Sequence, residues 1–530
     1  MWRQKLSGSY DIAVVGSGFS GSLMAMIARQ LGHSVVLIEK GTHPRVVIGE
    51  SSTPLSNLLL EELATRYDLP ALRPLAKWGS WQRAYPDVGC GLKRGFTFHH
   101  HVPGVTRADD PNRQDQLLVA ASPRDAIADT HWYRADFDHL LVREAQKLGV
   151  LYFDKTNLQR FCDHGSEIAL EGECNGQDVQ FRAKFVVDAT GPRGFLHRVL
   201  QLGERKLSGY PETQALYSHF SGVRRLGDTE YSRTAKAPPY PVDDAAVHHV
   251  FDGGWIWVLQ FSNGMASAGV AATNEFAARL CFHEGESAWG RILDLIPALK
   301  EQFAESKAER TFTHTPRLSF RSAQMAGHRW VQLPSAAGFV DPLLSTGFPL
   351  ALLGVERLAQ IIEQDWEADR LSARLEEYSA RTDAELVATA RLIGALYANM
   401  SNFPVFVALS LLYFAAVSYS EAARRLGNAH LASSFLLCGH PEFGPRAGRL
   451  LDRARLPFTQ VESAALIREI LAAIEPFDIA GLGRPERRNW YPVDADDLFN
   501  GADKLGATHD EISDMLRRCG FHAKHTLACD

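Results

Sequence analysis

Apolar residues near the N-terminus follow the pattern of a strand, a helix and a second strand. Residues 11–15 form a short, nearly continuous apolar run, which predicts a buried strand. Residues 22–31 are rich in the helix formers Leu, Met and Ala, and the glycine at position 32 is a typical helix stop. A second apolar run at 34–38 predicts another strand. Two buried strands joined by a helix predict a βαβ unit.

The turn between the first strand and the helix holds a GxGxxG pattern formed by Gly16, Gly18 and Gly21. Glycines at these positions permit a tight turn, close approach of a pyrophosphate to the backbone, and close contact between helix and strand. The helix N-terminus attracts phosphate charge, and Glu39, at the end of the second strand, stands where an acid can bind ribose hydroxyls. The segment therefore predicts a dinucleotide-binding site.

The longest apolar run, residues 403–417, lies in the C-terminal third of the chain. It is shorter than the roughly 20 apolar residues that span a bilayer, and it contains Pro404 and Ser410. We expect a buried helix here and no transmembrane segment. A hydrophobic substrate surface or a membrane-surface patch is the alternative.

Composition and charge limit which binding partners and which cellular compartment we expect for the protein. The chain has 530 residues, 62 acidic and 56 basic residues and a formal net charge of −6, so nothing global points to nucleic acid or to an anionic membrane. Its seven cysteines are dispersed without a CxxC pair, which fits a reducing compartment rather than a zinc site or a disulfide framework. The N-terminal segment enters the strand pattern without the features of a signal peptide. We therefore expect a cytoplasmic protein.

Two further segments resemble glutathione-reductase-type flavoproteins with a hydroxylase-like arrangement. One is the helical segment 131–150, with Arg134 at its start, and the other is the strand 181–194, which ends in Asp188-Ala-Thr-Gly. In those flavoproteins both segments flank FAD, so the resemblance implies FAD as the cofactor. A second glycine-rich strand–turn–helix motif is missing downstream, and we expect reduction by a separate flavin reductase, or a supply of free reduced flavin.

Four motifs in chain order resemble the FAD-dependent halogenases, the tryptophan-halogenase-like family of flavin monooxygenases. They are GESxxP within 46–64, YSHFSGV at 217–223, WxW within 253–261 and DPxxSTG within 335–359. In that family GESxxP lies by the isoalloxazine, DPxxSTG is the flavin and halide loop, and the tryptophan segment backs the flavin. Beyond the GxGxxG turn, the resemblance implies cofactor contacts for Gly49, Glu50, Ser51, Arg134, Asp188, Gly338, Asp341, Pro342, Ser345, Thr346 and Gly347.

The family's reaction assigns a role to a lysine. A flavin hydroperoxide oxidises chloride or bromide, and a lysine passes the oxidant to an aromatic substrate, free or bound to a carrier or protein. Lys93 matches the lysine of the phenol-type members by position, and Lys77 is a second candidate. The alternative for either residue is a surface or structural lysine. We also expect substrate contacts from Trp255 and Trp257, which could instead be core residues of a strand.

Three consecutive histidines follow Lys93, at positions 99–101. In a strand they point to alternating faces and cannot bind one ion together, so we expect no metal site. His99 is a candidate for binding a phenol or for general-base catalysis.

Three activities remain open at this point. Leu259-Gln260 replaces the Ile-Pro of the halogenase tryptophan segment, which favours an aromatic-ring monooxygenase that hydroxylates, on a free or protein-bound ring. Leu344 stands where tryptophan-type members have a glutamate, and there the chain is more similar to the phenol- and pyrrole-type members. The apolar run at 403–417 fits a third possibility, an FAD-dependent reductase of an apolar substrate. We rank halogenation of a phenol, pyrrole or indole first.

The expected architecture is an α/β chain built on a Rossmann-type FAD-binding fold. Residues 1–365 are expected to form the FAD module, with an interleaved, mixed β-sheet substrate region at about 75–130 and 205–325. Residues 366–530 are expected to form a mainly helical C-terminal region.

Overall fold

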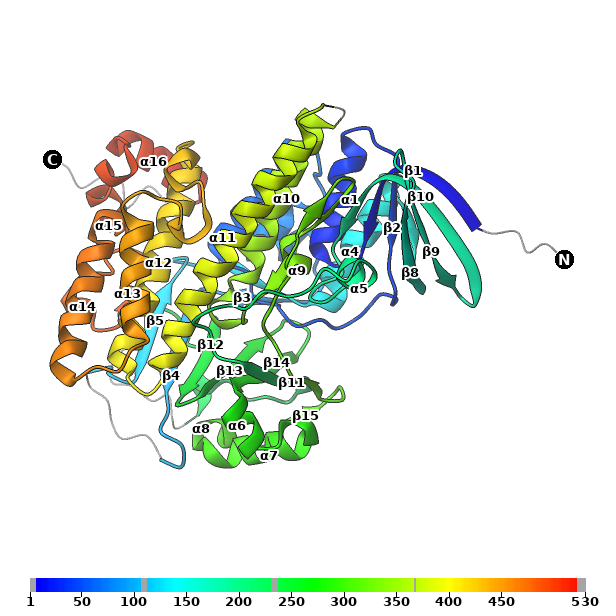
Figure 1. The fold of residues 1–530 in the computed structure, drawn as a ribbon. Coiled ribbons are helices and arrows are strands. Elements are labelled where there is room, and N and C mark those ends of the chain that lie inside the picture. The colour runs from blue at the N-terminus through cyan, green and yellow to red at the C-terminus, as the bar shows by residue number, and fades with distance from the viewer. Residues whose placement is uncertain (1–5, 106–111, 230–236, 367, 522–530) are drawn as a thin grey trace.

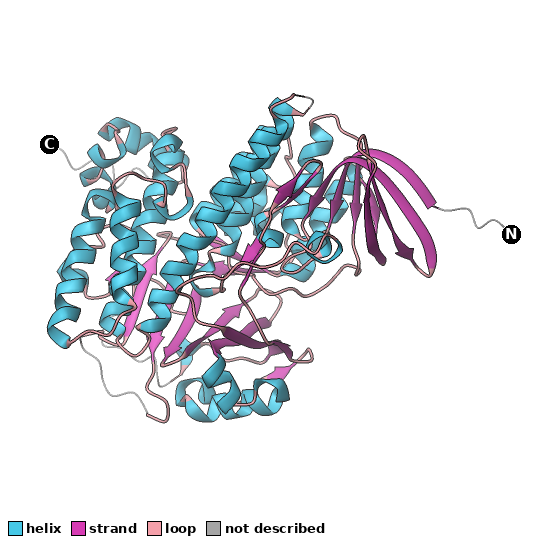
Figure 2. Ribbon diagram, in the orientation of Figure 1, coloured by secondary structure: helices cyan, strands magenta, loops and turns pink. Residues whose placement is uncertain are grey.

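The computed structural model describes residues 6–105, 112–229, 237–366 and 368–521. The first five residues of the N-terminal segment, and the last of the seven cysteines at position 529, lie outside these ranges. The fold combines two large β-sheets and two two-stranded ones with helices, and helices dominate the C-terminal third (Figure 1, Figure 2). The α/β class, with its helical C-terminal region, is confirmed.

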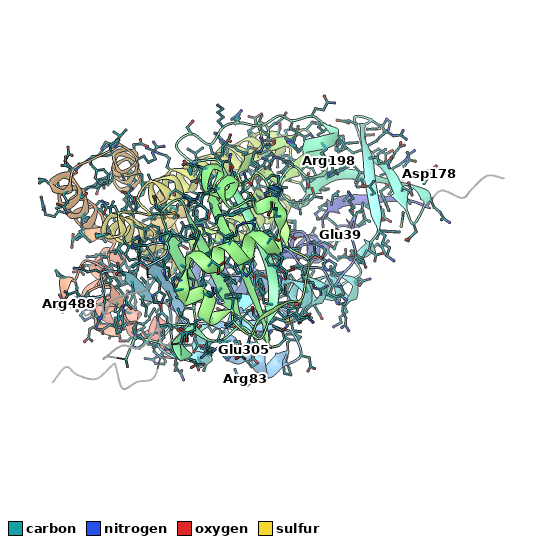
Figure 3. All side chains as sticks on the ribbon, turned by 90° about the horizontal axis from the view of Figure 1, so that it is seen from below. Glu39, Arg83, Asp178, Arg198, Glu305 and Arg488 are labelled. Atoms are coloured by element: carbon teal, nitrogen blue, oxygen red, sulfur yellow. The ribbon has the colours of Figure 1, made fainter. Side chains whose placement is uncertain are left out.

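The first sheet contains the predicted βαβ unit. Its parallel strands pair in the order β19, β10, β1, β2, β7, and β18 flanks β19 at the edge. Apolar side chains fill both faces of the central strands, as expected for a parallel sheet covered by helices. Asp178 of β10 lies at the opposite end of the molecule from Arg488 (Figure 3). The elements are β1 (Leu6–Val15), α1 (Phe19–Gln30), β2 (Val35–Ile38), α4 (Arg134–Lys147), β7 (Leu151–Phe153), β8 (Thr156–Asp163), β9 (Ile168–Cys174), β10 (Gln177–Asp188), β18 (Ala326–Gly327) and β19 (Trp330–Gln332).

The second sheet is mixed and mostly antiparallel, and three short helices lie along one side of it (Figure 1). Its strand β21, Trp490–Tyr491, comes from the C-terminal region and pairs with β5. The sequence predicted a mainly helical region there, without placing this strand. The Trp490 indole donates to Gln116 Oε1 at 3.0 Å, which holds this strand on the sheet edge. The other elements are β4 (Gly95–His100), β5 (Gln116–Ala120), β11 (Thr213–Ser221), β12 (Ala246–Phe251), β13 (Gly254–Gln260), β14 (Met265–Thr273), β15 (Lys307–Ala308), β16 (Thr313–Thr315), α6 (Asn274–Arg279), α7 (Glu286–Leu295) and α8 (Pro297–Gln302).

The C-terminal helices pack against both sheets (Figure 1). Helix α12, Phe403–Arg425, contains the apolar run of the sequence. By length and composition it is a candidate membrane span among the described residues, but 83% of its most apolar window is buried inside the protein. The run is thus part of a core helix, as expected. Helix α2 (Pro54–Arg66), from the N-terminal part of the chain, packs against α10 and α12. Further helices of this region are α10 (Gly347–Asp365), α11 (Leu371–Ala398), α13 (Phe443–Ala454), α14 (Gln460–Ile474), α15 (Ala495–Asn500) and α16 (His509–Arg518), and the shorter α3 (Trp78–Ala84), α5 (Phe195–Val199) and α9 (Pro334–Ala337) lie earlier in the chain.

One buried carboxylate joins the helical region to α10. Glu385 of α11 is 1% exposed, and its carboxylate accepts hydrogen bonds from both terminal nitrogens of Arg357, at 2.6 and 2.7 Å. It also accepts the backbone N–H of Phe435 at 2.8 Å. Three segments therefore converge on a single side chain.

Replacing Glu385 by alanine is expected to destabilise the protein by about 3–5 kcal/mol, because the buried Arg357 loses its counter-charge. The measurement is the midpoint of urea unfolding. The matched control is Glu363→Ala, which removes a surface pair with Arg66 and is expected to cost less than about 1 kcal/mol. Equal midpoints for the two variants would contradict the joining role of Glu385.

Candidate functional site

A cavity of about 450 Å³ lies where the first sheet, the second sheet and α10 meet. Most of the residues assigned to the cofactor line it. They are Gly18, Gly49, Glu50, Ser51, Arg134, Gly338, Asp341, Pro342, Ser345, Thr346 and Gly347. We call this space the flavin cavity. The glycine turn, the GES loop and the DPxxSTG loop, which lie far apart in the chain, therefore line the same cavity.

The three glycines of the GxGxxG turn have the separate roles expected for a nucleotide site. A Cβ atom on Gly16 would lie 2.6 Å from the carbonyl oxygen of Ala189, and one on Gly21 would lie 2.0 Å from that of Gly16. These two glycines allow the turn, the helix and β10 to pack. At Gly18 the nearest atom to an added Cβ would be 3.5 Å away, on Arg134, so the backbone here is open to the cavity. The turn fits a bound pyrophosphate.

Two acids assigned to the cofactor do not line the cavity. Asp188 is fully buried and accepts from the backbone N–H groups of Thr190 and Leu196, so it fixes the turn after β10. Glu39 accepts the N–H and the hydroxyl of Ser17, both at 2.9 Å, and the N–H of Gly41. These bonds, with nearby Arg45, lower the pKa of Glu39 against the effect of its burial. Its carboxylate braces the glycine turn.

The GES loop is held by two side-chain contacts. Arg134, at the start of α4, binds both oxygens of Asp138 at 2.7 and 2.8 Å and donates to the carbonyl of Gly49 at 2.9 Å. The Glu50 carboxylate lies 3.0 and 3.1 Å from His219 Nε2, and both side chains are buried. His219 belongs to the YSHFSGV motif, so this contact explains why the two motifs occur together.

Asp341, in the DPxxSTG motif, is a buried acceptor for four donors. Tyr210 and Tyr397 donate their hydroxyls at 2.8 and 2.9 Å, and the Trp255 indole N–H donates at 3.1 Å. The backbone N–H of Leu343 donates at 2.9 Å. Burial raises the pKa of Asp341 to about 6, although these hydrogen bonds favour the ionised form. The flavin loop is thereby tied to the second sheet and to α11.

The next residues of the same loop hold an uncommon backbone conformation. Leu344 and Ser345 have φ angles of 63° and 55°, in the left-handed region that non-glycine residues rarely adopt. The loop then enters α10 at Gly347. This geometry directs the N-terminus of a 19-residue helix, with its favourable field for an anion, at the flavin cavity.

Trp255 and Trp257 of β13 line the flavin cavity, as does His248 of β12. The Trp255 ring lies 5.1 Å from the His248 ring and 5.6 Å from the Trp257 ring, between centroids. Burial lowers the pKa of His248 to about 3, so this imidazole is neutral at ordinary pH. The two tryptophans thus face the cofactor space.

Lys93 is completely buried, and its contacts reach residues of the flavin cavity and of a second cavity. Its ammonium nitrogen donates to Ser51 Oγ at 2.8 Å and to the carbonyl oxygen of Ser52. It also lies 3.8 Å from the centroid of the Phe96 ring, a cation–π contact. Ser51 lines the flavin cavity, whereas Phe96 lines the second cavity. Burial lowers the pKa of Lys93, which favours the neutral amine.

The second cavity has a volume of about 190 Å³ and mostly apolar walls. Strands β4 and β5 form one side, α12 contributes Tyr413 and Phe414, and α2 contributes Asn57. Asp129 lines it from β6 (Asp129–Trp132), which pairs with β3 (Cys90–Lys93) so that Asp129 stands directly opposite Lys93. Lys77 lines the same cavity and donates to the Cys519 carbonyl at 3.5 Å.

The histidines at 99–101 alternate as predicted for a strand. His99 and His101 pack on His249, whereas the ring of His100 stacks on Phe403. His99 is buried and lines neither the flavin cavity nor the second cavity. Within the described ranges, no three His, Cys, Asp or Glu residues are grouped so as to hold a metal ion.

Sequence reasoning missed five residues that shape the site: Asn57, Asp129, His219, Tyr210 and Tyr397. Four of them lie in no sequence motif that indicates a catalytic or binding role. His219 lies in the YSHFSGV motif, but the motif indicated no role for its side chain.

The chain is similar to flavin-dependent halogenases over most of its length. It is 28% identical to monodechloroaminopyrrolnitrin halogenase PrnC of Pseudomonas fluorescens, over 80% of this chain and 74% of that protein. It is also 28% identical to tetracycline 7-halogenase of Kitasatospora aureofaciens, over 75% of this chain and 71% of the relative. Among solved structures, halogenase PltM in complex with phloroglucinol and FAD has the same fold, with a TM-score of 0.79 and 23% identity over 90% of this chain and 99% of PltM.

Residues 11–317, more than half of the chain, match the family model described as FAD dependent oxidoreductase. This match agrees with the open glycine turn and with the cavity that the flavin motifs surround. The chain belongs to the FAD dependent oxidoreductase family, and it is an FAD-dependent enzyme.

Proposed function

We propose that the protein halogenates an electron-rich aromatic ring, using reduced FAD, dioxygen and chloride or bromide. The observation that carries the proposal is the buried Lys93, which is bonded to Ser51 of the flavin cavity and contacts Phe96 of the second cavity. The similarity to halogenases such as PrnC supports the reaction class.

The flavin cavity supplies the contacts that FAD needs. The open backbone at Gly18 and the guanidinium groups of Arg45 and Arg134 suit the pyrophosphate, and Trp255 and Trp257 give an aromatic wall. Reduced FAD supplies the activation of dioxygen when it is bound. The GES and DPxxSTG loops line this space, and keeping water out of it would protect a reactive oxidant.

A halide fits the loop that begins α10. Ser345, Thr346 and Gly347 lie at the positive end of the helix dipole and line the flavin cavity. We infer that this loop holds chloride or bromide beside the cofactor. The buried Asp341 maintains the loop in its strained conformation through its bond from the Leu343 N–H.

Lys93 connects oxidant formation with substrate modification. Its ammonium form can donate a hydrogen bond to hypohalous acid, and its neutral amine can accept the halogen. Burial favours the neutral amine, because a charged group is costly to desolvate. Lys77 lines the second cavity and a further cavity beside it, but not the flavin cavity, whereas Lys93 is bonded to the GES loop, so Lys93 is the better candidate.

The second cavity is the proposed substrate site. Its apolar walls and small volume suit a single aromatic ring. A free small molecule fits this space directly, and a carrier-bound ring would need its linker to leave through the mouth of the cavity. The reductant is proposed to be a separate flavin reductase, or reduced flavin taken up from solution.

Hydroxylation is the second candidate, and Leu259 favours it. This residue lines the flavin cavity in the place where halogenases carry the isoleucine of their Ile-Pro pair. Without that pair, the activated oxygen could be transferred to the ring directly.

Gly18→Val is expected to abolish FAD binding while the protein folds, because the added side chain would occupy the pyrophosphate space. Flavin absorbance after purification or reconstitution is the readout. Gly21→Val is the matched control, since its side chain would collide with the Gly16 backbone and should prevent folding. A folded Gly18→Val protein that retains FAD would remove the nucleotide-site assignment.

Lys93→Ala and Lys93→Arg are both expected to lose at least about 100-fold of substrate modification, on the scale of one essential proton-transferring group. FAD content and oxygen consumption should persist, because the flavin cavity forms without the lysine. Arginine retains the charge but offers no neutral amine. Product mass and oxygen uptake are measured together. Full modification by Lys93→Ala would refute the relay and direct attention to Lys77.

Exchange of chloride for bromide should change the mass of the product by the difference between the two halogens. Mass spectrometry of a reaction with an aromatic probe and reduced FAD is the measurement. A product that gains only oxygen, whatever halide is present, would establish hydroxylation instead.

A further inference from the structure

Two acceptor oxygens in the wall of the second cavity have no donor among the described residues. Asn57 Nδ2 donates to Asp129 Oδ1 at 2.8 Å. Since a carboxylate accepts, this bond fixes the amide with its nitrogen toward Asp129 and its oxygen elsewhere. Asp129 Oδ2 and Asn57 Oδ1 are both buried and lack hydrogen-bond partners among the residues that the structure describes.

Unpaired buried acceptors are costly, at about 1–3 kcal/mol for each group. Phe96, Phe414 and Leu55 of the surrounding wall are apolar and have no side-chain donor. Lys77 and Arg425 also line the cavity, but within the described residues they make no hydrogen bond to either oxygen. The buried Tyr413 hydroxyl, on the same wall, also has no partner in the described part of the chain. The cavity is thus an apolar slot with a small polar end, which is the form of a site for a ring bearing an acidic hydrogen.

We propose that Asp129 accepts the acidic hydrogen of the aromatic substrate, so that the enzyme selects rings with a phenolic O–H or a pyrrole-type N–H. This inference rests on the proposed function and names its substrate class. Asp129 stands directly opposite Lys93 in the β3–β6 pair, and so the two groups act on the same ring. Asn57 is a positioning residue that leaves Oδ2 as the oxygen available to the substrate.

The reaction of a phenol with hypohalous acid at this site balances in protons and electrons. The phenolic proton passes to Asp129 Oδ2, and its electron pair moves through the ring to form a bond from an ortho or para carbon to the halogen. The oxygen–halogen bond breaks, and the hydroxide that leaves takes a proton from the Lys93 ammonium to become water. The ring carbon then gives its proton to the Lys93 amine, and the ring oxygen regains the proton from Asp129. The products are a halophenol and water.

The electrostatics of the pair support this exchange. Burial raises the pKa of Asp129, and it lowers that of Lys93. Glu421 of α12 raises the pKa of Asp129 further, while Lys93 and Arg425 lower it. Asp129 is therefore a stronger base than an exposed aspartate.

The test compares phloroglucinol with its trimethyl ether, which has a similarly electron-rich ring but no O–H. Reactions of the FAD-loaded protein with reduced FAD and bromide are followed by product mass. Asp129→Asn keeps the size of the side chain but removes the base. We expect it to lower the bromination rate of phloroglucinol by about 100-fold and that of the ether by less than about threefold. Equal losses on both probes, or no loss, would overturn the inference.

The control is Asp243→Asn, which alters a buried aspartate outside both cavities that accepts the N–H groups of Leu226 and Gly227. This variant should affect both probes alike, which separates a loss of stability from a loss of the base.

A binding measurement keeps the inference testable if the wild type halogenates neither probe, the result that would count against the proposed function. Titration of the FAD-loaded protein should then show about tenfold weaker binding of phloroglucinol to Asp129→Asn, as expected for a lost charged hydrogen bond. Binding of the ether should be unchanged. Equal affinities of wild type and variant for phloroglucinol would refute the role of Asp129.

Discussion

Complete burial of the Lys93 amine is the constraint on which the proposed site depends. An isolated charge is expensive to remove from water, so a buried lysine needs partners close by. Here they are Ser51 and Ser52 from the GES loop, the Phe96 ring, and Asp129 opposite on β6. Since these groups come from separate segments, the lysine is satisfied only when the flavin loop and the strands of the second cavity are assembled together.

The same fold links the flavin loop to the C-terminal helices. Asp341 gathers donors from the second sheet and from α11, and Glu385 of α11 binds Arg357 of α10. The helical region also closes the second cavity through Tyr413 and Phe414 of α12. The C-terminal third is therefore a wall of the proposed reaction chamber as well as a support for the flavin loop.

The sequence predicted the parts of the molecule that depend on local backbone geometry. The βαβ unit and the GxGxxG turn could be predicted because glycine spacing indicates the turn and apolar runs indicate the helix and the two strands. The motif residues of the GES and DPxxSTG loops do line one cavity, which is the arrangement that their resemblance implied. The sequence also predicted that the apolar run at 403–417 forms a buried helix.

Contacts between distant segments could not be predicted in the same way. Asp129 and Asn57 are 72 positions apart, and nothing in the flanking sequence shows that they share a hydrogen bond. Strand β21 joins the second sheet from a region expected to be helical, since two residues are too few to give a periodic signal. Glu39 and Asp188 carry the residue types of ligand-binding positions, but the fold engages both in bracing turns. His99 follows Lys93 closely in the chain, yet its side chain packs on His249, away from both cavities.

The central claim is that Lys93 separates the cofactor from the substrate. A crystal structure of the protein with FAD and phloroglucinol tests it most directly. The account predicts the isoalloxazine in the flavin cavity beside Ser51, and the phloroglucinol ring in the second cavity with a hydroxyl on Asp129 and a ring carbon facing the Lys93 amine. A phloroglucinol ring bound in the flavin cavity, in direct contact with the isoalloxazine and away from Lys93, would contradict it.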